Sequence, residues 1–486
     1  MPFPIRPARS RPRTAPTITT VGAILVVLAF LPGPAAGSPL AAEEPLPAAY
    51  ELEVAIVPAE HALRGRADVR FPAGVANPDT IVFYLHGELA VDSLAIDGEP
   101  LPVSQTPVFY PYDYSLVARR VEAVLQGRKL SAGLTVWYSG HFHPSRARSR
   151  SDYMRIDQDG ALLRSYGYSL WFPVFLDSGR DGHAADFPRV EITVPAEFAA
   201  VFAGDWLARE RDGDLMRYRW RAENLDLFAA QLTARRFVTR SEENCTAWVL
   251  DDPEVLAAAA RILDFSRRLD TIFRDRYRTG DPGRQLHLMQ MPRFGDIASG
   301  NVIGIETGSW MEFDPESHSG RTIAHELVHD RVRVDVPRAD PLFALAVEGF
   351  PSYFHLPVLG ESLGDTFYDD IVSRIEQGYR QRRSSGNDSR GRPLPPEKPI
   401  YAIGPDEIGI YKDRFVLPDR VVLFFDALRR RLGPDRFTAF TRDLFAHDGL
   451  DCTSFEAIVL EHVPGFGPEL HDWLVTTRYP VVEAGR

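Results

Sequence analysis

Residues 321–330 read Arg-Thr-Ile-Ala-His-Glu-Leu-Val-His-Asp. His325 and His329 are four positions apart, so on a helix they lie on one face, a single turn from each other. Both imidazoles can then reach one metal ion. The other positions of this segment are mostly apolar: Ile323, Ala324, Leu327 and Val328. A buried helix does not turn two histidines and a glutamate inward unless they have partners, because unpaired polar groups are costly there.

The glutamate beside the first histidine adds a candidate general base. Glu326 is placed so that its carboxylate can meet a water held by the metal rather than the metal itself. His-Glu-x-x-His is the two-histidine half of a catalytic zinc site. The motif alone is only moderately specific, because three fixed residues also match by chance. The alternative is an ordinary helix with two surface histidines.

A lone carboxylate downstream offers a third ligand. Glu348 lies in the apolar stretch Phe-Ala-Leu-Ala-Val-Glu-Gly-Phe, residues 343–350, which is a poor place for an unpaired glutamate. Eighteen residues separate it from His329, enough for a turn and a return helix. A catalytic zinc site needs three protein ligands and an open position. We therefore predict that one Zn2+ ion is bound by His325, His329 and Glu348.

A proline close to Glu348 complicates the return helix. Pro351 follows three residues later, removes one helical hydrogen bond and disfavours a regular turn. Either the helix kinks there, or Glu348 lies close to a helix start.

The complete arrangement resembles a known family. His-Glu-x-x-His, eighteen residues, then Glu followed by Gly-Phe-x-x-Tyr-Phe is similar to the gluzincin zinc aminopeptidases. Residues 134–140 (Leu-Thr-Val-Trp-Tyr-Ser-Gly) and 170–173 (Leu-Trp-Phe-Pro) resemble parts of that family's N-terminal domain. The resemblance covers the family's N-terminal and thermolysin-like catalytic domains, and not its long helical C-terminal domain. It implies a zinc peptidase that acts on peptide substrates.

Two further site elements are implied by the resemblance. Gly304-Ile305-Glu306-Thr307 resembles the family's Gly-x-Met-Glu-Asn strand, although Ile305 and Thr307 depart from it. This implies that the strand at Gly304 binds the substrate backbone and that Glu306 holds its free amino terminus.

A tyrosine further along resembles the family's Tyr-x-Lys-Gly motif. Tyr411 lies 63 residues after Glu348, although residues 412–414 read Lys-Asp-Arg. The resemblance implies that Tyr411 donates a hydrogen bond to the oxyanion that forms during hydrolysis. Its alternative is a structural tyrosine at a helix start.

These residues predict peptide-bond hydrolysis, with removal of amino-terminal residues as the leading reading. Glu326 would accept a proton from the attacking water and pass it to the leaving amine. A zinc endopeptidase with an open cleft is an alternative, because the Gly304 strand departs from the family pattern. A catalytically inactive binding module with a peptidase fold is a second alternative.

Outside the motif, the sequence predicts an α+β protein with two parts after its start. Alternating patterns, as at residues 50–57, 134–138, 190–194 and 216–220, predict a β-rich saddle or sandwich domain over residues 46–243. From Asp252-Pro253, apolar residues recur at helical spacing, and these two residues suit a helix start. This spacing predicts a mostly helical domain over residues 244–486, and the resemblance implies that it is a thermolysin-like zinc-peptidase domain.

The first 45 residues predict export. Four arginines precede an apolar run from Val21 to Leu31, and small residues follow it, as in a secretory signal. The run is about half as long as the roughly 20 residues that a spanning helix needs, so we expect cleavage and no stable membrane span afterwards. The expected location is periplasmic or extracellular, with a membrane anchor as the alternative if the signal is not cleaved.

Charge and cysteines set further limits. The 67 acidic and 55 basic residues give a formal net charge of −12, which argues against a general nucleic-acid partner. Cys245 and Cys452 could form one disulfide in an oxidising compartment or remain separate thiols, and the sequence leaves both open.

Overall fold

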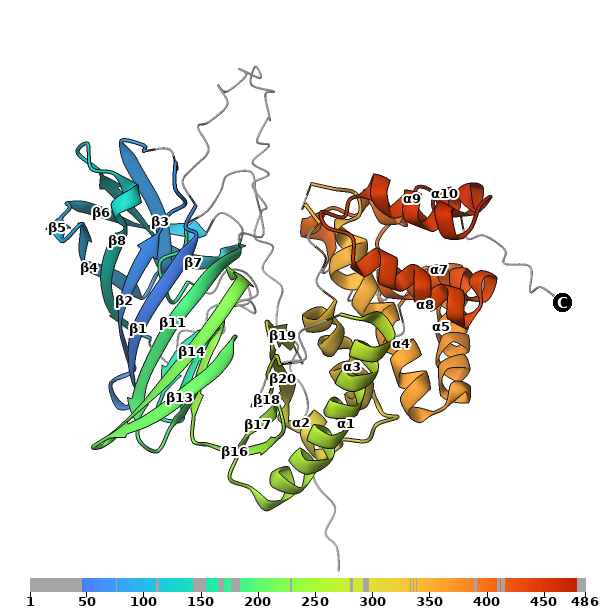
Figure 1. Cartoon of the computed structure of the whole chain (residues 1–486), viewed down its shortest axis with the longest axis horizontal. Helices are drawn as coiled ribbons and strands as arrows, with labels where there is room; N and C mark the ends of the chain where they lie inside the picture. The colour runs from blue at the N-terminus through green and yellow to red at the C-terminus, as the bar shows by residue number, and fades with distance from the viewer. Residues whose placement is uncertain are drawn as a thin grey trace, which may run out of the picture. The chain divides into compact units, whose positions relative to one another are not determined.

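The computed structural model describes residues 46–478, apart from 76, 111–112, 143–153, 165–169, 176–183, 228–229, 280–282, 292–296, 333, 335, 338, 389–390, 409–410 and 412–415. The predicted signal segment therefore lies outside the described residues. Strands dominate the chain up to residue 306, and helices dominate it afterwards (Figure 1). The α+β class is confirmed, with a β-rich N-terminal region and a mostly helical C-terminal part.

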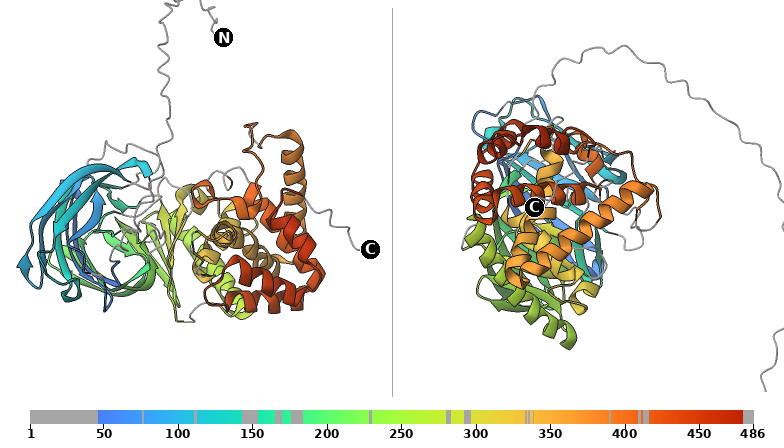
Figure 2. Two further views of the ribbon diagram at one scale, coloured as in Figure 1. Left: turned by 90° about the horizontal axis from the view of Figure 1, so that it is seen from above. Right: turned by 90° about the vertical axis from the view of Figure 1, so that its right-hand side faces the viewer.

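The β-rich region contains three sheets, whose strand orders are β13-β14-β11-β1-β2-β8-β4-β5, β12-β15-β10-β9 and β3-β7-β6. The first of these sheets is strongly curved (Figure 2). The strands are β1 (Ala49–Val57), β2 (Ala62–Arg70), β3 (Thr80–His86), β4 (Leu89–Ile96), β5 (Glu99–Pro100), β6 (Val103–Tyr110), β7 (Asp113–Val124), β8 (Leu134–His141), β9 (Arg155–Asp157), β10 (Gly160–Leu163), β11 (Ala184–Pro195), β12 (Ala199–Phe202), β13 (Asp205–Asp212), β14 (Leu215–Asp226) and β15 (Leu232–Arg235).

Strand β1 shows why this sequence forms a sheet with one buried face. Its residues alternate between buried and partly exposed positions, with period 2. Glu53 on the outer side pairs with Arg66 of β2 at 3.9 Å and with Arg189 of β11 at 2.9 Å. Opposite charges on adjacent strands favour this register, and the predicted strands of the region are confirmed.

A further sheet of five strands begins the helical half of the chain. Its order is β16-β17-β18-β20-β19, and its strands are β16 (Phe237–Glu242), β17 (Cys245–Leu250), β18 (Leu286–Met291), β19 (Ile297–Ser299) and β20 (Val302–Glu306). Helix α1 (Pro253–Tyr277) connects the parallel strands β17 and β18. As the sequence predicts, Asp252 caps α1, because its carboxylate accepts hydrogen bonds from the amides of Glu254 and Val255.

The remaining helices follow this sheet (Figures 1 and 2). They are α2 (Thr307–Met311), α3 (His318–Arg331), α4 (Phe350–Leu363), α5 (Asp365–Ser385), α7 (Val416–Leu432), α8 (Pro434–Phe445), α9 (Cys452–His462) and α10 (Gly467–Leu474). A π-helical turn, Leu345–Gly349, precedes α4, and short 3-10 turns occur at Pro58–Glu60, Leu130–Ala132, Ile400–Ala402 and Pro405–Glu407. None of the helices in the described ranges is both long and apolar enough to cross a membrane.

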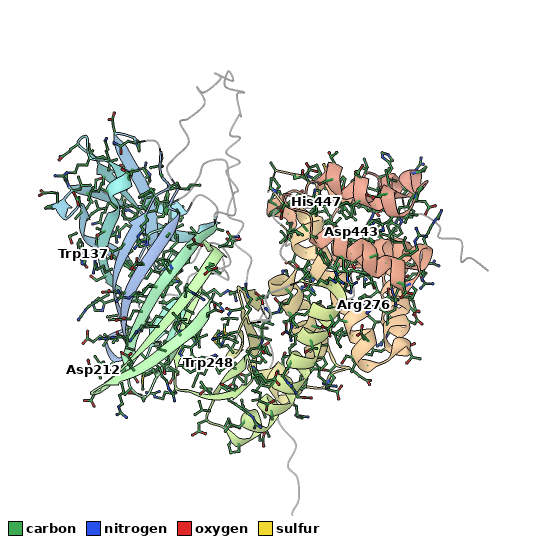
Figure 3. The ribbon with its side chains drawn as sticks, in the orientation of Figure 1. Trp137, Asp212, Trp248, Arg276, Asp443 and His447 are labelled. Carbon is green, nitrogen blue, oxygen red and sulfur yellow. The ribbon has the colours of Figure 1, made fainter. Side chains whose placement is uncertain are left out.

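The five-stranded sheet packs on both of its faces. On β18, Met289 belongs to the core of the β-rich region, whereas Leu288 belongs to the core of the helical part. On β17, Trp248, labelled in Figure 3, faces the first core and its neighbour Val249 faces the second. Successive strand residues point to opposite faces, so this sheet is buried between the two cores. The boundary at residue 243/244 stays a prediction.

The two cysteines are both free thiols. Cys245 is buried in β17, and Cys452 is partly exposed at the start of α9. The structure thus has the separate-thiol arrangement, one of the two that the sequence leaves open.

Candidate metal centre

The helix that carries the motif has one partly exposed face. Helix α3 begins at an N-cap, Ser317, whose hydroxyl accepts a hydrogen bond from the amide of Ser319. From residue 319 to residue 331 every position is buried except four: Arg321, Thr322, His325 and His329. The two histidines therefore share the open face of an otherwise buried helix, as their spacing predicts.

The two imidazoles converge on one point. Their Nε2 atoms lie 3.3 Å apart, and their rings meet edge to face with centroids 5.0 Å apart. Tetrahedral zinc with Zn–N bonds of about 2.0–2.1 Å holds two nitrogen ligands about 3.3–3.4 Å apart. The spacing of the two Nε2 atoms therefore fits a shared zinc ion.

Glu348 comes to the same point from the next part of the chain. Its Oε2 lies 3.8 Å from Nε2 of His325 and 4.0 Å from Nε2 of His329. Two neutral nitrogens and one carboxylate oxygen form the donor set of a catalytic zinc site, so the residues present fit that ion.

The backbone around Glu348 explains the proline that the sequence left unresolved. Glu348 lies in the π-helical turn Leu345–Gly349, in which the amide of Phe350 donates to the carbonyl of Leu345. Pro351 then falls in the first turn of α4, where its missing N–H is not needed. Glu348 is thus close to a helix start, one of the two expected possibilities. Single π-helical turns are frequent at functional sites.

A second carboxylate, Glu326, also reaches the histidine pair. Its oxygen and the ligand nitrogens of His325 and His329 all lie within 4.8 Å of one another. However, Oε2 of Glu326 also accepts a hydrogen bond of 2.7 Å from the amide of Ala298 in β19. This bond fixes the carboxylate beside the pair and suits a proton acceptor better than a third ligand.

The strand expected to bind substrate backbone lies inside the sheet. Gly304 in β20 pairs with Met289 of β18 on one side and with Ile297 of β19 on the other. The role of Gly304 in binding substrate backbone stays a prediction, and strand β19 is the one at the edge of the sheet. The physical reason is a hairpin: Gly300, at φ 57, and Asn301 turn the chain so that Ser299 pairs with Val302.

Glu306 is at the end of β20, exposed, at the N-cap position of α2. Its role in binding an amino terminus stays a prediction.

Tyr411 is held by a different part of the chain. Its side chain is 3% exposed, and its hydroxyl donates a hydrogen bond of 2.8 Å to the carbonyl of Pro396. Burial raises the pKa of Tyr411, and the charges of Lys398 and Glu407 act on it as well. In the described part of the chain, the hydrogen bond of Tyr411 is with Pro396, and the charges that act on it are those of Lys398 and Glu407. Neither interaction involves the histidine pair or its two glutamates.

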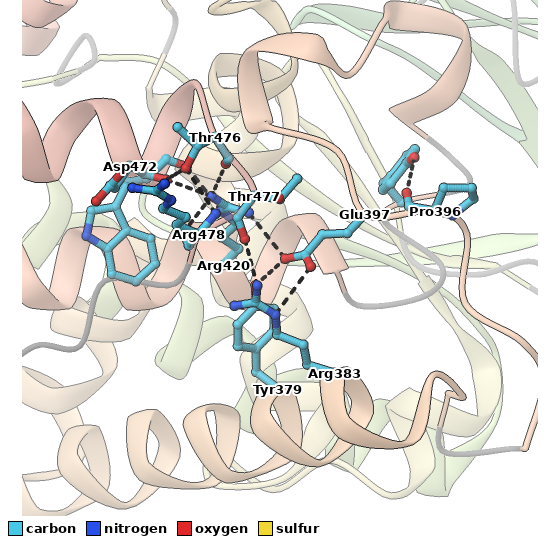
Figure 4. Close-up of polar contacts among 11 residues, drawn as sticks. Tyr379, Arg383, Pro396, Glu397, Arg420, Asp472, Thr476, Thr477 and Arg478 are labelled. Atoms are coloured by element: carbon cyan, nitrogen blue, oxygen red, sulfur yellow. Dashed lines mark hydrogen bonds and ion pairs between the residues drawn. The ribbon is translucent and has the colours of Figure 1, made fainter.

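A buried arginine fixes the segment that holds Tyr411. Glu397, next to Pro396, contacts Arg383 at 3.2 Å and Arg420 at 3.4 Å (Figure 4). Arg420 also donates to the backbone carbonyls of Asp472 and Trp473 at the end of α10 and of Arg478 after it. The position of Tyr411 thus depends on the contact between α7 and the C-terminal helix.

Two further side chains near the pair escaped the sequence reasoning. His355 on α4 packs its ring against that of His325, with centroids 5.7 Å apart. It lies seven residues after Glu348, two helical turns along the same face, and this spacing was a signal for it. Burial and, to a smaller extent, the charge of Arg321 lower the pKa of His355 from 6.5 to about 4, against the hydrogen bond to Pro351, which raises it. Arg321 lies four residues before His325, again one turn away on one face.

Asp330, the residue after His329, connects helix α3 to its surroundings. Asp330 is buried and pairs with Arg284 and Arg331, each at 2.7 Å. Arg331 in turn contacts Asp270 of α1 at 2.6 Å. These paired charges fix the end of α3 against α1, since breaking a buried ion pair is costly.

No protein-family model matches the sequence, and no curated protein matches it. Among solved structures, the M1 zinc metallopeptidase from Deinococcus radiodurans is similar, with 18% identity and a TM-score of 0.63 over 90% of this chain and 96% of that one. Yeast LTA4 hydrolase is similar with 14% identity and a TM-score of 0.63, over 90% of this chain and 69% of that one. The described chain therefore has the fold of the M1 zinc metallopeptidases.

Proposed function

We propose that this protein is a zinc-dependent metallopeptidase in which His325, His329 and Glu348 bind one Zn2+ ion. The observation that carries the proposal is the convergence of two Nε2 atoms, 3.3 Å apart, and Oε2 of Glu348, within 4.0 Å of both. The fold shared with zinc metallopeptidases supports the same conclusion. Bound zinc would polarise the scissile carbonyl and lower the pKa of the attacking water.

Glu326 has the position that proton transfer requires. Its carboxylate is buried, is held by the amide of Ala298 and lies beside the histidine pair. It would accept the proton of the attacking water and deliver it to the nitrogen of the leaving amine. Tyr411 remains the proposed donor to the oxyanion, and its hydroxyl must leave the carbonyl of Pro396 to act there.

Peptides are the proposed substrates. A mutant of the Deinococcus enzyme has been solved with a bound Tyr-Ser-Ala substrate. In this chain, β19 is the edge strand of the five-stranded sheet, and its Ala298 contacts Glu326. An extended peptide can add to such an edge through main-chain hydrogen bonds, which would bring its carbonyls to the metal.

Removal of amino-terminal residues is the finer part of the proposal. It relies on Glu306, whose exposed carboxylate ends β20 and could pair with a substrate ammonium. An endopeptidase remains the second candidate, because the Gly304 strand is enclosed by its neighbours instead of forming the edge. Free and amino-blocked versions of one peptide distinguish the two, since only an endopeptidase cleaves both.

Export of the protein is proposed from the sequence of residues 1–45 alone. Expression of the full chain, followed by mass measurement of the mature protein, tests whether the segment is removed.

The central experiment pairs metal analysis with peptide hydrolysis. We expect about one zinc per chain and activity that a chelator abolishes and added zinc restores. Glu326→Gln should keep the zinc and lower kcat by about 10²–10⁴-fold, the usual contribution of general acid–base catalysis. Glu461→Gln, an exposed glutamate on α9, is the control and should retain full activity. A fully active Glu326→Gln enzyme would refute the proposed role.

A further inference from the structure

The open face of α3 carries a cation as well as the two histidines. Arg321 is one of the four positions between 319 and 331 that are not buried. It precedes His325 by one helical turn, a rise of about 6 Å. Nothing in the proposed hydrolysis uses this side chain.

Arg321 has no acidic counter-charge in the parts of the chain that the structure describes. No carboxylate there forms an ion pair with it, and the charge that acts on it is a second cation, Arg374 of α5. Burial is the main cause that lowers the pKa of Arg321, and repulsion by Arg374 adds to it. Arg374 is exposed, and its Nε donates to the backbone carbonyl of Asp370, at 3.2 Å.

Other arginines on the same two helices do form ion pairs with carboxylates. Arg331, ten residues along the same helix, contacts two carboxylates, those of Asp270 and Asp330. Arg380, on the same helix as Arg374, pairs with Glu376 at 2.6 Å. A half-buried guanidinium without a counter-ion is costly, because water is removed from the charge without replacement. The exception at Arg321 therefore needs an explanation.

His355 places this charge beside the metal centre. The ring of His355 packs against His325, and the charge of Arg321 acts on it. Nδ1 of His355 lies 2.7 Å from the carbonyl of Pro351, and since a carbonyl only accepts, Nδ1 carries the proton. His355 thus contacts a proposed ligand, and its ring carries no negative charge in either protonation state. It is not a counter-ion for Arg321.

We propose that Arg321, with Arg374 beside it, binds a carboxylate of the peptide substrate on the leaving-group side. The proposal rests on the proposed peptidase function and names its substrate class: short peptides with a free C-terminal carboxylate one or two residues beyond the scissile bond. The rise of about 6 Å from His325 to Arg321 equals about two extended residues at about 3.3 Å each. A planar guanidinium binds a carboxylate through two parallel hydrogen bonds.

Two sources of the carboxylate are possible on a peptide, namely its C-terminus and an acidic side chain. The assay therefore compares three peptides of equal length: Leu-Ala-Ala with a free carboxylate, its C-terminal amide, and the amide of Leu-Glu-Ala. Wild-type enzyme should have a kcat/KM for the free acid about 10- to 100-fold above that for the plain amide, the range expected for a charge-assisted pair. The difference should appear mainly in KM.

Substitutions then test the residue itself. Arg321→Gln should remove the preference by lowering kcat/KM for the free acid. The kcat/KM for the plain amide should change by less than about twofold. Arg321→Lys keeps the charge without the fork and should retain part of the preference. Arg380→Gln removes a paired, exposed arginine and should leave the preference unchanged. If Arg321→Gln lowered kcat/KM equally for the acid and the amide, or lowered it for neither, the proposal would be overturned.

Binding without turnover separates this inference from the proposed function. Zinc-loaded Glu326→Gln protein is titrated calorimetrically with the three peptides, with and without Arg321→Gln. Tighter binding of the free acid that disappears with Arg321→Gln supports the carboxylate site, even if no variant hydrolyses peptides and the peptidase function fails. Equal binding of acid and amide, or no binding of any peptide, overturns it. Tighter binding of the Leu-Glu-Ala amide alone overturns the assignment to the C-terminus.

Discussion

At the scale of single residues, the two glutamates beside the histidine pair are distinguished by what else holds them. Oε2 of Glu326 accepts a hydrogen bond from the amide of Ala298, which orients it from the sheet side. Glu348 approaches both Nε2 atoms from the π-helical turn before α4. In the proposed mechanism, Glu326 therefore moves the proton and Glu348 binds the metal.

This difference gives a prediction about metal affinity. Glu348→Ala should weaken zinc binding by at least about 100-fold, because even outer contacts of a metal ligand contribute 10- to 100-fold. Glu326→Gln should bind zinc close to the wild-type level. The check is a competition titration of both proteins against a chromogenic chelator. Equal zinc affinity of Glu348→Ala and wild type would show that Glu348 is not a ligand.

The sequence predicted the convergence of these residues well and their supports poorly. His325, Glu326 and His329 could be predicted because spacing on one helix alone brings them together. Glu348 could be predicted because a lone carboxylate in an apolar stretch needs a partner. The contact of Glu326 with Ala298 could not be predicted, because it uses a backbone amide, which every residue except proline has. Arg321 also went unnoticed, since its lack of a counter-ion depends on residues far away in the chain.

At the scale of elements, the start of α3 depends on a glycine. Gly320 lies in the first turn, and a Cβ there would meet the carbonyl oxygen of Pro315 at 2.2 Å. The loop before α3 thus packs directly on the helix backbone. The same loop supplies the N-cap Ser317, whose hydroxyl accepts a hydrogen bond from the amide of Ser319. This hydrogen bond and the packing of Pro315 on Gly320 together determine where α3 begins.

A pair of alanine substitutions tests this packing. Gly320→Ala should destabilise the protein by about 1–3 kcal/mol, because the backbone of the loop must move to admit a methyl group. Gly378→Ala in α5 should instead stabilise it by about 0.5–1 kcal/mol, because a Cβ there meets only the guanidinium group of Arg382, at 3.1 Å, and alanine favours a helix more than glycine does. Urea unfolding of both variants gives the comparison. Equal effects of the same sign would contradict the role assigned to Gly320.

Two elements show the limits of local pattern reading. The strand over residues 301–307 was predictable from its apolar run, and β20 confirms it. Its hairpin partner β19 was missed, although Gly300-Asn301 is a dipeptide that favours a two-residue turn. The π-helical turn at Leu345–Gly349 was not predictable, because it arises from packing and not from local preference. These two elements are the ones that position Glu326 and Glu348.

At the scale of the whole described chain, one sheet connects the two cores. Trp248 of β17 packs with Trp206 and Trp220 of the β-rich region at centroid distances of 5.1 and 5.9 Å. Next to them, His287 of β18 accepts a hydrogen bond of 3.2 Å from Nε1 of Trp248. A polar ring is therefore enclosed among indoles where the sheet of the helical part meets the first core.

This enclosed histidine predicts acid sensitivity of the fold. Burial lowers the pKa of His287 from 6.5 to about 3, so the folded protein keeps the ring neutral while the unfolded chain protonates it below about pH 6.5. Between these two pKa values the unfolded state binds more protons, and stability falls as pH decreases. One such group contributes a slope of up to about 1.4 kcal/mol per pH unit.

His287→Gln should therefore lose less stability than wild type between pH 6.5 and pH 4.5, whatever its stability at pH 7. The exposed His447, replaced by Gln, is the control and should follow the wild-type slope. Urea unfolding across this pH range measures the slopes, and parallel curves for His287→Gln and wild type would remove His287 as a cause of acid unfolding.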